Sequence, residues 1–321
     1  MYSVELLKKA AWHLSLVTPS SRIIFDNCLL YTYNKKLCHI TKALRFVSPL
    51  KPRRVFMKKL FSLTFILILL LTTAVSGQAE GATNIQVGDY LVFGRYDQDG
   101  NRSNGLESIE WQVLEIKDGK ALIISRNGLE VYEYDKRVPW PTWANSKVRK
   151  WLNSTFMNMV FNKKEQACIE VTTVVTPDNS LWVEYRKATN RKYEAVSDGR
   201  ETKDKLFLLS AEEVLELCGL NTIQEQLDSV EAREMMKAIA TKHAEYAGAF
   251  VYHGGMEEYK LDGQGCCWWM LRSPGHLSNH LAYVGSGGNL NSFHYTDVHH
   301  LDVCIRPVCW VNLAMLQALG Y

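Results

Sequence analysis

The sequence lacks the short motifs by which many enzymes and metal proteins are recognised. It has no Gly-x-Ser-x-Gly turn for a nucleophilic serine, no His-Glu-x-x-His pair, and no Cys-x-x-Cys pair combined with histidine. It also has no internal repeat and no low-complexity linker. We therefore nominate no catalytic residue and no motif-based metal ligand, and we treat the globular part as one unit.

Acidic residues are scarce at the start of the chain. The first 59 residues hold twelve Lys and Arg but only Glu5 and Asp26, out of 37 basic and 34 acidic residues in the whole chain. Residues 60–79 carry no charge, so the remainder holds 25 basic and 32 acidic side chains, a net charge of −7. A negative domain without a basic stripe argues against binding to nucleic acid.

One long apolar run occurs, and its flanks indicate export. Met57-Lys58-Lys59 precedes the run, which extends from Leu60 to Val75 and is followed by the small residues Gly77 and Ala79. This order of charged, apolar and small residues is typical of a secretory signal peptide. We expect Met57–Ala79 to be that peptide, with cleavage before Glu80, and the protein to be secreted or held at the cell surface.

Two expectations about the beginning of the chain follow. Because a signal peptide works at the N-terminus, Met57 rather than Met1 is the expected start, and residues 1–56 are an upstream extension that is not native. The alternative is an uncleaved signal anchor, since the 20 uncharged residues between Lys59 and Glu80 are enough to span a bilayer. Membrane attachment is expected only in that case.

Residues 80–321 predict a single α+β domain with no internal boundary. The expected elements, in chain order, are a strand in 87–96, a hairpin of 110–117 with 120–126, helices over 143–152, 162–169 and 210–219, and a longer helix over 221–247 that forms a helical insertion. Short strands are expected late, at 268–273, 283–285 and 305–311, separated by loops rich in Gly, Asn, Ser and His.

Local signals mark the hairpin and the helix starts. Asp118-Gly119 between two alternating runs is a strong signal for a hairpin turn. Ser146 or its neighbour Asn145 is a suitable N-cap, and Asn162 with Glu165 forms a capping-box pattern. Ser210 with Glu213 repeats that pattern. In the late strands, Trp268 and Trp269 must face opposite sides, so at most one of them is expected in the same core.

Several segments together resemble a known family. The matching pieces are Glu110–Leu114, Ala121–Ser125, Trp143 with Ser146 and Arg149, Trp151–Asn153, Phe207–Ser210, Trp268–Gly275 and Ile305–Pro307. They resemble, in the same order, a family of exported or surface bacterial proteins called domain of unknown function 6273. Trp111, Trp151, Trp269, Arg272 and Arg306 are the motif residues, and we expect them to have structural roles in the core and between the late strands.

The order of elements is also similar to the C-type-lectin-like fold: an N-terminal hairpin, two short helices and loop-rich late strands. That fold is shared by sugar-binding lectins, other ligand-binding domains and formylglycine-generating enzymes, so it does not fix a function. The chain departs from the family in reading Cys304-Ile305-Arg306-Pro307 where Gly-Val-Arg-Pro is usual. It also lacks the Glu-Pro-Asn and Trp-Asn-Asp triplets of calcium-dependent lectins.

The six cysteines of the expected exported part leave alternatives open. An even number in an oxidising compartment favours disulfides, but the sequence does not choose among the pairings. Cys168 and Cys218 lie among apolar helical residues, as buried thiols do. The spacing of Cys304 and Cys309 resembles the copper-binding pair of formylglycine-generating enzymes, which gives copper and an oxidase activity as an alternative to a protein without cofactor.

A polar stretch between the late strands is the expected ligand-binding surface, because loops on a rigid scaffold commonly carry binding residues. Its candidate residues are Asn279, His280, Asn289, Asn291, Tyr295 and Asp297. The sequence thus predicts a non-enzymatic module that binds an extracellular glycan, peptide or surface protein. A copper-dependent oxidase and a purely structural envelope protein are the alternatives.

Overall fold

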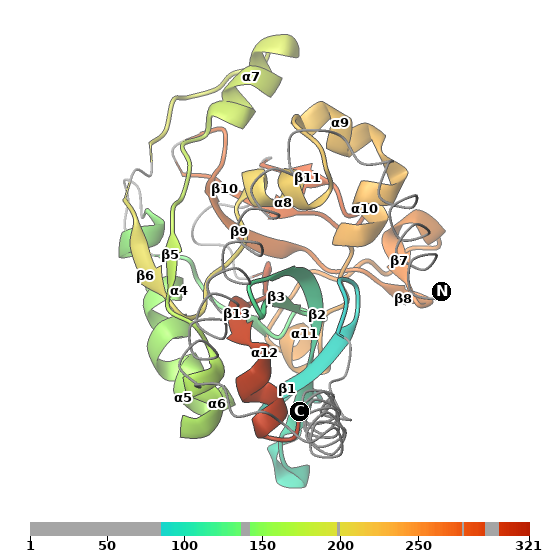
Figure 1. Cartoon of the computed structure of the whole chain (residues 1–321). Helices are drawn as coiled ribbons and strands as arrows, with labels where there is room; N and C mark the ends of the chain where they lie inside the picture. Colours follow the sequence, from blue (N-terminus) through green and yellow to red (C-terminus); the bar gives the residue numbers. More distant parts are fainter. Residues whose placement is uncertain (1–84, 136–141, 198–199, 278, 293–301) are drawn as a thin grey trace, which may run out of the picture. The chain divides into compact units, whose positions relative to one another are not determined.

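The computed structural model describes residues 85–135, 142–197, 200–277, 279–292 and 302–321 (Figure 1). The expected extension 1–56, the signal segment Met57–Ala79 and the candidates Tyr295 and Asp297 lie outside these residues. Gly81–Tyr321 cluster into one compact unit. None of the helices in the described ranges is both long enough and apolar enough to cross a membrane.

The first sheet is antiparallel and curled. Its strands are β1 (Tyr90–Tyr96), β2 (Glu107–Lys117), β3 (Lys120–Ser125) and β13 (Val308–Asn312), in the order β1-β2-β3-β13. Asp118 and Gly119 both have positive φ, 50° and 72°, so the predicted hairpin turn is confirmed. Register shifts within both the β1–β2 and the β2–β3 pair accompany the curl, as bulges do in bent strands.

The second sheet is built from the late strands. It contains β11 (Leu290–Asn291), β10 (Leu281–Val284), β9 (Trp269–Pro274), β12 (Cys304–Ile305) and β4 (Glu130–Val131), in that order. The β12–β9 pair is parallel and the other pairs are antiparallel. Only Arg306 and Pro307 separate β12 from β13, so the chain passes directly from the second sheet into the first.

Short helices follow the hairpin as predicted. A 3-10 turn (Trp143–Asn145) leads into α4 (Lys147–Trp151), a π-helical turn (Leu152–Phe156), α5 (Met157–Val160) and α6 (Lys163–Cys168). Ser146 is the N-cap of α4, because its hydroxyl accepts a bond from the Arg149 amide, and Asn162 with Glu165 forms the predicted capping box of α6. Local capping chemistry therefore sets these helix starts.

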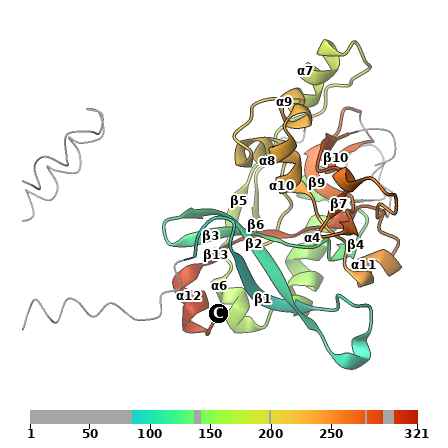
Figure 2. The same cartoon turned by 90° about the vertical axis from the view of Figure 1, so that its right-hand side faces the viewer.

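An arm extends from the two sheets. It consists of β5 (Thr172–Val174), α7 (Ser180–Ala188) and β6 (Thr202–Asp204), and Figure 2 shows α7 at its far end. The chain then returns to α8 (Ala211–Leu217), whose capping box of Ser210 and Glu213 is as predicted. Gly219, with φ of 68°, follows its last turn.

The prediction of one long helix over 221–247 is wrong. The segment forms three short helices, α9 (Ile223–Asp228), α10 (Val230–Met236) and α11 (Lys242–Tyr246). Ser229 ends α9 and caps α10 by accepting a bond from the Ala232 amide, so a capping residue overrides the helix propensity around it. Between α10 and α11, the amide of Gly128 donates to the Ile239 carbonyl, and the carbonyl of Gly128 accepts from the Thr241 amide. Ala238 and Ala240 of this connection belong to the core.

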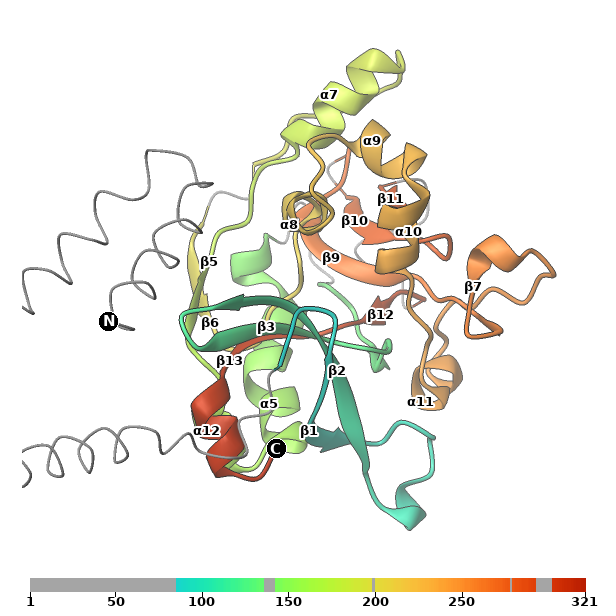
Figure 3. The same cartoon turned by 45° about the vertical axis from the view of Figure 1, so that its right-hand side comes forward.

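The remaining elements flank the second sheet and close the chain. A 3-10 turn (Glu257–Tyr259) precedes the small hairpin of β7 (Lys260–Leu261) and β8 (Gln264–Gly265). A second 3-10 turn (Arg102–Asn104) lies between β1 and β2. Helix α12 (Leu313–Ala318) follows β13. Figure 3 shows α9 and α10 beside β10 and β11, and hydrogen bonds of the Gln226 side chain to Gly288 and Leu290 fix α9 there.

Candidate ligand-binding cleft

The tryptophans of the family motifs lie in the interior. Trp111 and Trp269 are fully buried, and their indole nitrogens donate to the carbonyls of Phe93 (2.6 Å) and Met236 (2.9 Å). Trp151 stacks on Tyr132 with the ring centroids 4.3 Å apart. Each ring thus joins segments that are distant in the sequence, and none of the three lines a described cavity.

The two motif arginines bind backbone and side chains inside the domain. Arg272 is 1% exposed and makes a two-pronged ion pair with Glu213, at 2.5 and 2.6 Å, while also donating to the carbonyls of Leu208 and Val175. Arg306 donates to the Ser125 carbonyl and stands over the Trp269 ring. Burial lowers the pKa of Arg306 to about 10.

The cysteines of the described ranges are free thiols. Cys304 belongs to β12 and Cys309 to β13, in different sheets. The sulfur next to Cys304 is that of Cys267: the two thiols are hydrogen-bonded, and this bond together with burial raises the pKa of Cys304. Burial alone raises the pKa of Cys309. The contact between Cys267 and Cys304 was not foreseen from the sequence.

Three carboxylates gather in the loop after β1. Ligand atoms of Asp97, Asp99 and Glu107 lie within 4.8 Å of one another. Each is bound by donors of the same loop: Asp97 by the Gly100 amide and Arg102, Asp99 by the Asn101 amide, and Glu107 by the Gln98 amide. These donors account for the clustering, because they neutralise and orient the three groups.

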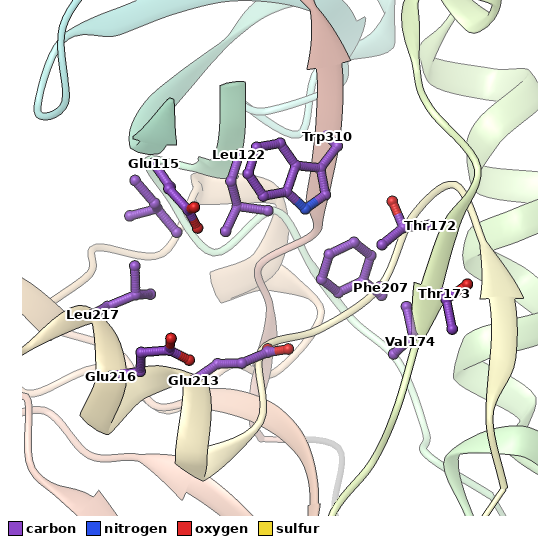
Figure 4. A pocket seen from close by; sticks show the side chains of 11 residues that line it. Glu115, Leu122, Thr172, Thr173, Val174, Phe207, Glu213, Glu216, Leu217 and Trp310 are labelled. Atoms are coloured by element: carbon purple, nitrogen blue, oxygen red, sulfur yellow. The ribbon is translucent and has the colours of Figure 1, made fainter. Parts of the chain in front are cut away.

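One hollow, which we call the acidic pocket, lies between α8, β5 and the first sheet (Figure 4). Its volume is about 450 Å³, and it combines the rings of Phe207 and Trp310 with the carboxylates of Glu115, Glu213 and Glu216. Glu213 is already bound to Arg272. None of the described residues that line the pocket has a buried polar atom without a partner.

A smaller hollow of about 250 Å³, which we call the aromatic cleft, lies at the end of β10. Its lining residues are Phe250, Tyr252, Tyr259, Trp268, Tyr283, Gly285, Ser286, Gly287, Asn289 and Asn291. Phe250 stacks on Trp268 (centroids 4.0 Å apart, planes at 21°), and Trp268 contacts Tyr283 at 5.3 Å. Tyr252 and Tyr259 form a second pair, 4.9 Å apart. Five aromatic rings therefore wall a single cleft.

Strand alternation and a tight turn build this cleft. Trp269 points into the core, so its neighbour Trp268 points the other way and is only half-buried. Beyond Tyr283, the chain turns through Gly285–Asn289, closed by a bond from the Gly285 amide to the Asn289 carbonyl. Gly288 has φ of 75°, and a side chain there would collide with the carbonyl of Arg233 in α10. Only glycine fits that position.

Unpaired polar groups line the turn. A Cβ added at Gly285 would lie 2.9 Å from Asn291 Nδ2 and 3.0 Å from Asn289 Oδ1. A donor and an acceptor thus lie close together beside Gly285. Neither amide has a hydrogen-bond partner among the residues that the structure describes, and the buried hydroxyl of Ser286 has none there either. The buried hydroxyl of Ser286 is costly unless a ligand or water completes its bonds, whereas the half-exposed amides are open to a ligand or to water.

The comparisons with known proteins give the family. The family described as Domain of unknown function (DUF6273) matches residues 118–313, more than half of the chain. The chain belongs to this family. The resemblance deduced from the motifs is thereby confirmed at the level of the DUF6273 family, and the whole aromatic cleft lies inside the matched region. No curated protein and no solved structure matched the chain.

Two of the six candidates in this DUF6273 domain come together in the cleft, Asn289 and Asn291. Asn279 and His280 lie at the opposite end of β10, where the His280 ring contacts His276 at 4.7 Å. Tyr295 and Asp297 are outside the described residues. The aromatic wall was missed, although the opposite orientation of Trp268 and Trp269 was a signal that one of the two rings is available outside the core.

Proposed function

We propose that this DUF6273 protein is an exported, non-enzymatic module that binds a glycan in the aromatic cleft. The observation that carries the proposal is the row Phe250, Trp268 and Tyr283, which ends at the unpaired amides of Asn289 and Asn291. Binding sites of this kind combine apolar walls with a few convergent polar groups. The proposal requires no cofactor.

The chemistry of a sugar ring matches this row. A pyranose presents apolar C–H groups on its faces and hydroxyl groups around its rim. Aromatic rings bury the faces, while an amide donor next to an amide acceptor serves a hydroxyl, which both donates and accepts. At about 250 Å³ the cleft is below the usual range for drug-sized ligands, and this favours a single sugar unit of a longer glycan.

The same proposal includes the location and the fold. The order of charged, apolar and small residues in Met57–Ala79 supports a signal peptide, with residues 80–321 as the exported domain and residues 1–56 as a non-native extension. The N-terminal hairpin, the short helices and the late sheet support a C-type-lectin-like arrangement. Its partner would then be a glycan of the cell envelope or the surroundings.

A glycan array followed by calorimetric titration tests the proposal. We expect Trp268→Ala to weaken binding about tenfold or more, because truncating a central aromatic contact removes most of the stacking surface. The matched control is Trp310→Ala, a half-buried tryptophan of the acidic pocket, and it should leave the affinity unchanged. A peptide array is run in parallel. Saturable binding of peptides only, or of no ligand at all, would contradict a glycan-binding function.

A further inference from the structure

A second hollow, which we call the Arg233 pocket, adjoins the aromatic cleft. It has a volume of about 360 Å³ and lies between α10 and the turn after β10. The two hollows share Tyr259, Gly287 and Asn289. A ligand seated against Trp268 can therefore continue past Asn289 into the Arg233 pocket without leaving the surface.

Arg233 is the unusual group in this pocket. In the described ranges its guanidinium makes no hydrogen bond and no ion pair, and its Nε is buried without a partner. A buried donor without an acceptor is costly, which distinguishes Arg233 from an arginine that simply extends into solvent. The planar guanidinium fork matches the oxygens of a carboxylate or sulfate group.

The two carboxylates in the same pocket are engaged elsewhere. Glu234 pairs with Lys237 at 2.6 Å, and Glu258 interacts with Tyr259. The negative charge of Glu258 raises the pKa of Tyr259, whereas Arg233 acts in the opposite direction. The neutral phenol of Tyr259 leaves the negative charge of Glu258 in place, and Arg233 is the cation among the described residues that line the pocket. The domain's net charge of −7 disfavours anionic partners in general, so the local attraction for an anionic group rests on the guanidinium of Arg233 and its buried Nε, which has no acceptor in the described ranges.

We propose that the bound glycan is acidic, with one sugar against the rings of the aromatic cleft and the carboxylate or sulfate group of the next sugar on Arg233. This inference rests on the proposed function and adds the class of saccharide. Asn289, which lines both hollows, is placed to contact both sugars. The binding site then has two adjacent subsites, one that recognises a ring face and one that recognises charge.

The test uses the purified protein and three sets of oligosaccharides: uronic-acid oligosaccharides, the same compounds after reduction of their carboxyl groups, and sulfated neutral oligosaccharides. The first two separate charge from ring shape, and the third distinguishes sulfate from carboxylate. Each set is titrated against the wild type, Arg233→Gln and the control Arg126→Gln. Arg126 already pairs with Glu110 and Asp262, away from both hollows.

We expect removal of the charge to weaken binding to the wild type and to Arg126→Gln about tenfold or more. The Arg233→Gln variant should bind charged and neutral forms with equal, low affinity, while Arg233→Lys should keep part of the preference. Equal affinity of the wild type for charged and neutral sugars would overturn this inference and leave the proposed function intact. An Arg233→Gln variant that keeps the full preference would also overturn it. Binding to none of the three sets would overturn it as well, and the absence of any binding on the glycan array would in addition refute the proposed function itself.

Discussion

The acidic pocket and the aromatic cleft differ in how their polar groups are satisfied. The acidic pocket is larger, about 450 Å³ against 250 Å³, yet its central carboxylate, Glu213, is held by the buried Arg272. In the aromatic cleft, the amides of Asn289 and Asn291 have no partner among the described residues. Under the proposed function, the larger of the two hollows is not the binding site, and polar groups without partners at an aromatic wall mark the site instead.

The same difference separates contacts that stabilise the fold from polar groups that are available to a ligand. Folding alone accounts for the contacts in the acidic pocket, because the ion pair of Arg272 with Glu213 joins α8 to β9. Folding does not account for the buried hydroxyl of Ser286 in the aromatic cleft, which has no partner among the described residues and on its own reduces stability. Groups that cost stability are expected where function requires them. The following predictions test this division, beginning with the largest effect.

The largest effect is expected for Glu213→Ala. The substitution leaves the charge of Arg272 buried without its partner, which costs about 3 kcal/mol of unfolding free energy. Urea denaturation measures the change. The control is Glu216→Ala, an exposed carboxylate of the same pocket for which no ion pair is found in the described ranges, and its effect should stay within about 0.5 kcal/mol. Equal losses in both variants would contradict a structural role for the acidic pocket.

Alkaline pH should destabilise the protein through one buried group in the aromatic cleft and one beside the acidic pocket. Burial raises the pKa of Tyr283, in the aromatic cleft, to about 12, and burial raises that of Cys309, in β13 beside the acidic pocket. The folded state therefore holds protons that the unfolded chain releases. This stabilisation is complete below pH 9 and is lost as the pH rises through 9 to 12, at up to about 1.4 kcal/mol per pH unit for each group.

Substitutions measure the share of this loss that comes from each of these two groups. Denaturation at pH 8, 9, 10 and 11 should show a shallower decline for Cys309→Ala from pH 9 upward, and for Tyr283→Phe only from about pH 10. The difference arises because the unfolded thiol titrates about one unit below the unfolded phenol. A protein whose stability does not change between pH 8 and 11 would show that these groups are not buried as described.

A smaller effect is expected at two buried serines near the cleft. Ser286 has no hydrogen-bond partner in the described ranges, whereas the hydroxyl of Ser292 bonds to His276 at 2.8 Å. Ser286→Ala should therefore raise the unfolding free energy by about 1 kcal/mol, and Ser292→Ala should lower it by a similar amount. Thermal unfolding of the two variants measures both shifts. Shifts of the same sign would show that Ser286 is already satisfied in the free protein.

Local sequence signals predicted those parts of the fold that depend on neighbouring residues. The Asp118-Gly119 turn and the caps at Ser146, Asn162 and Ser210 are decided within a few residues, so pattern reading found them. The break at Ser229 was missed because helix propensity in the segment favoured a continuous helix over the serine cap, and the second break, between α10 and α11, depends on pairing with the distant Gly128.

The candidate site was only partly predictable. Asn289 and Asn291 were found because polar residues clustered between strands indicate a loop. Phe250, Tyr259 and Trp268 are distant in sequence from these asparagines, and only tertiary contacts, among them the pairing of β9 with β10, bring them together. Arg233 carried no signal, because an arginine within a helical pattern is expected at a solvated surface. Tertiary contacts alone show that it lacks a partner.

The most direct test of the binding function is a titration of glycan into Gly285→Ala. Position 285 does not have a positive φ, so alanine is compatible with the backbone, but its methyl group would occupy the space between the Asn289 and Asn291 amides. The control is Gly255→Ala, where an added Cβ meets no atom within 4 Å. We predict that both variants fold, that Gly285→Ala binds about tenfold or more weakly, and that Gly255→Ala binds like the wild type. Wild-type affinity in a folded Gly285→Ala variant would contradict glycan binding in the aromatic cleft.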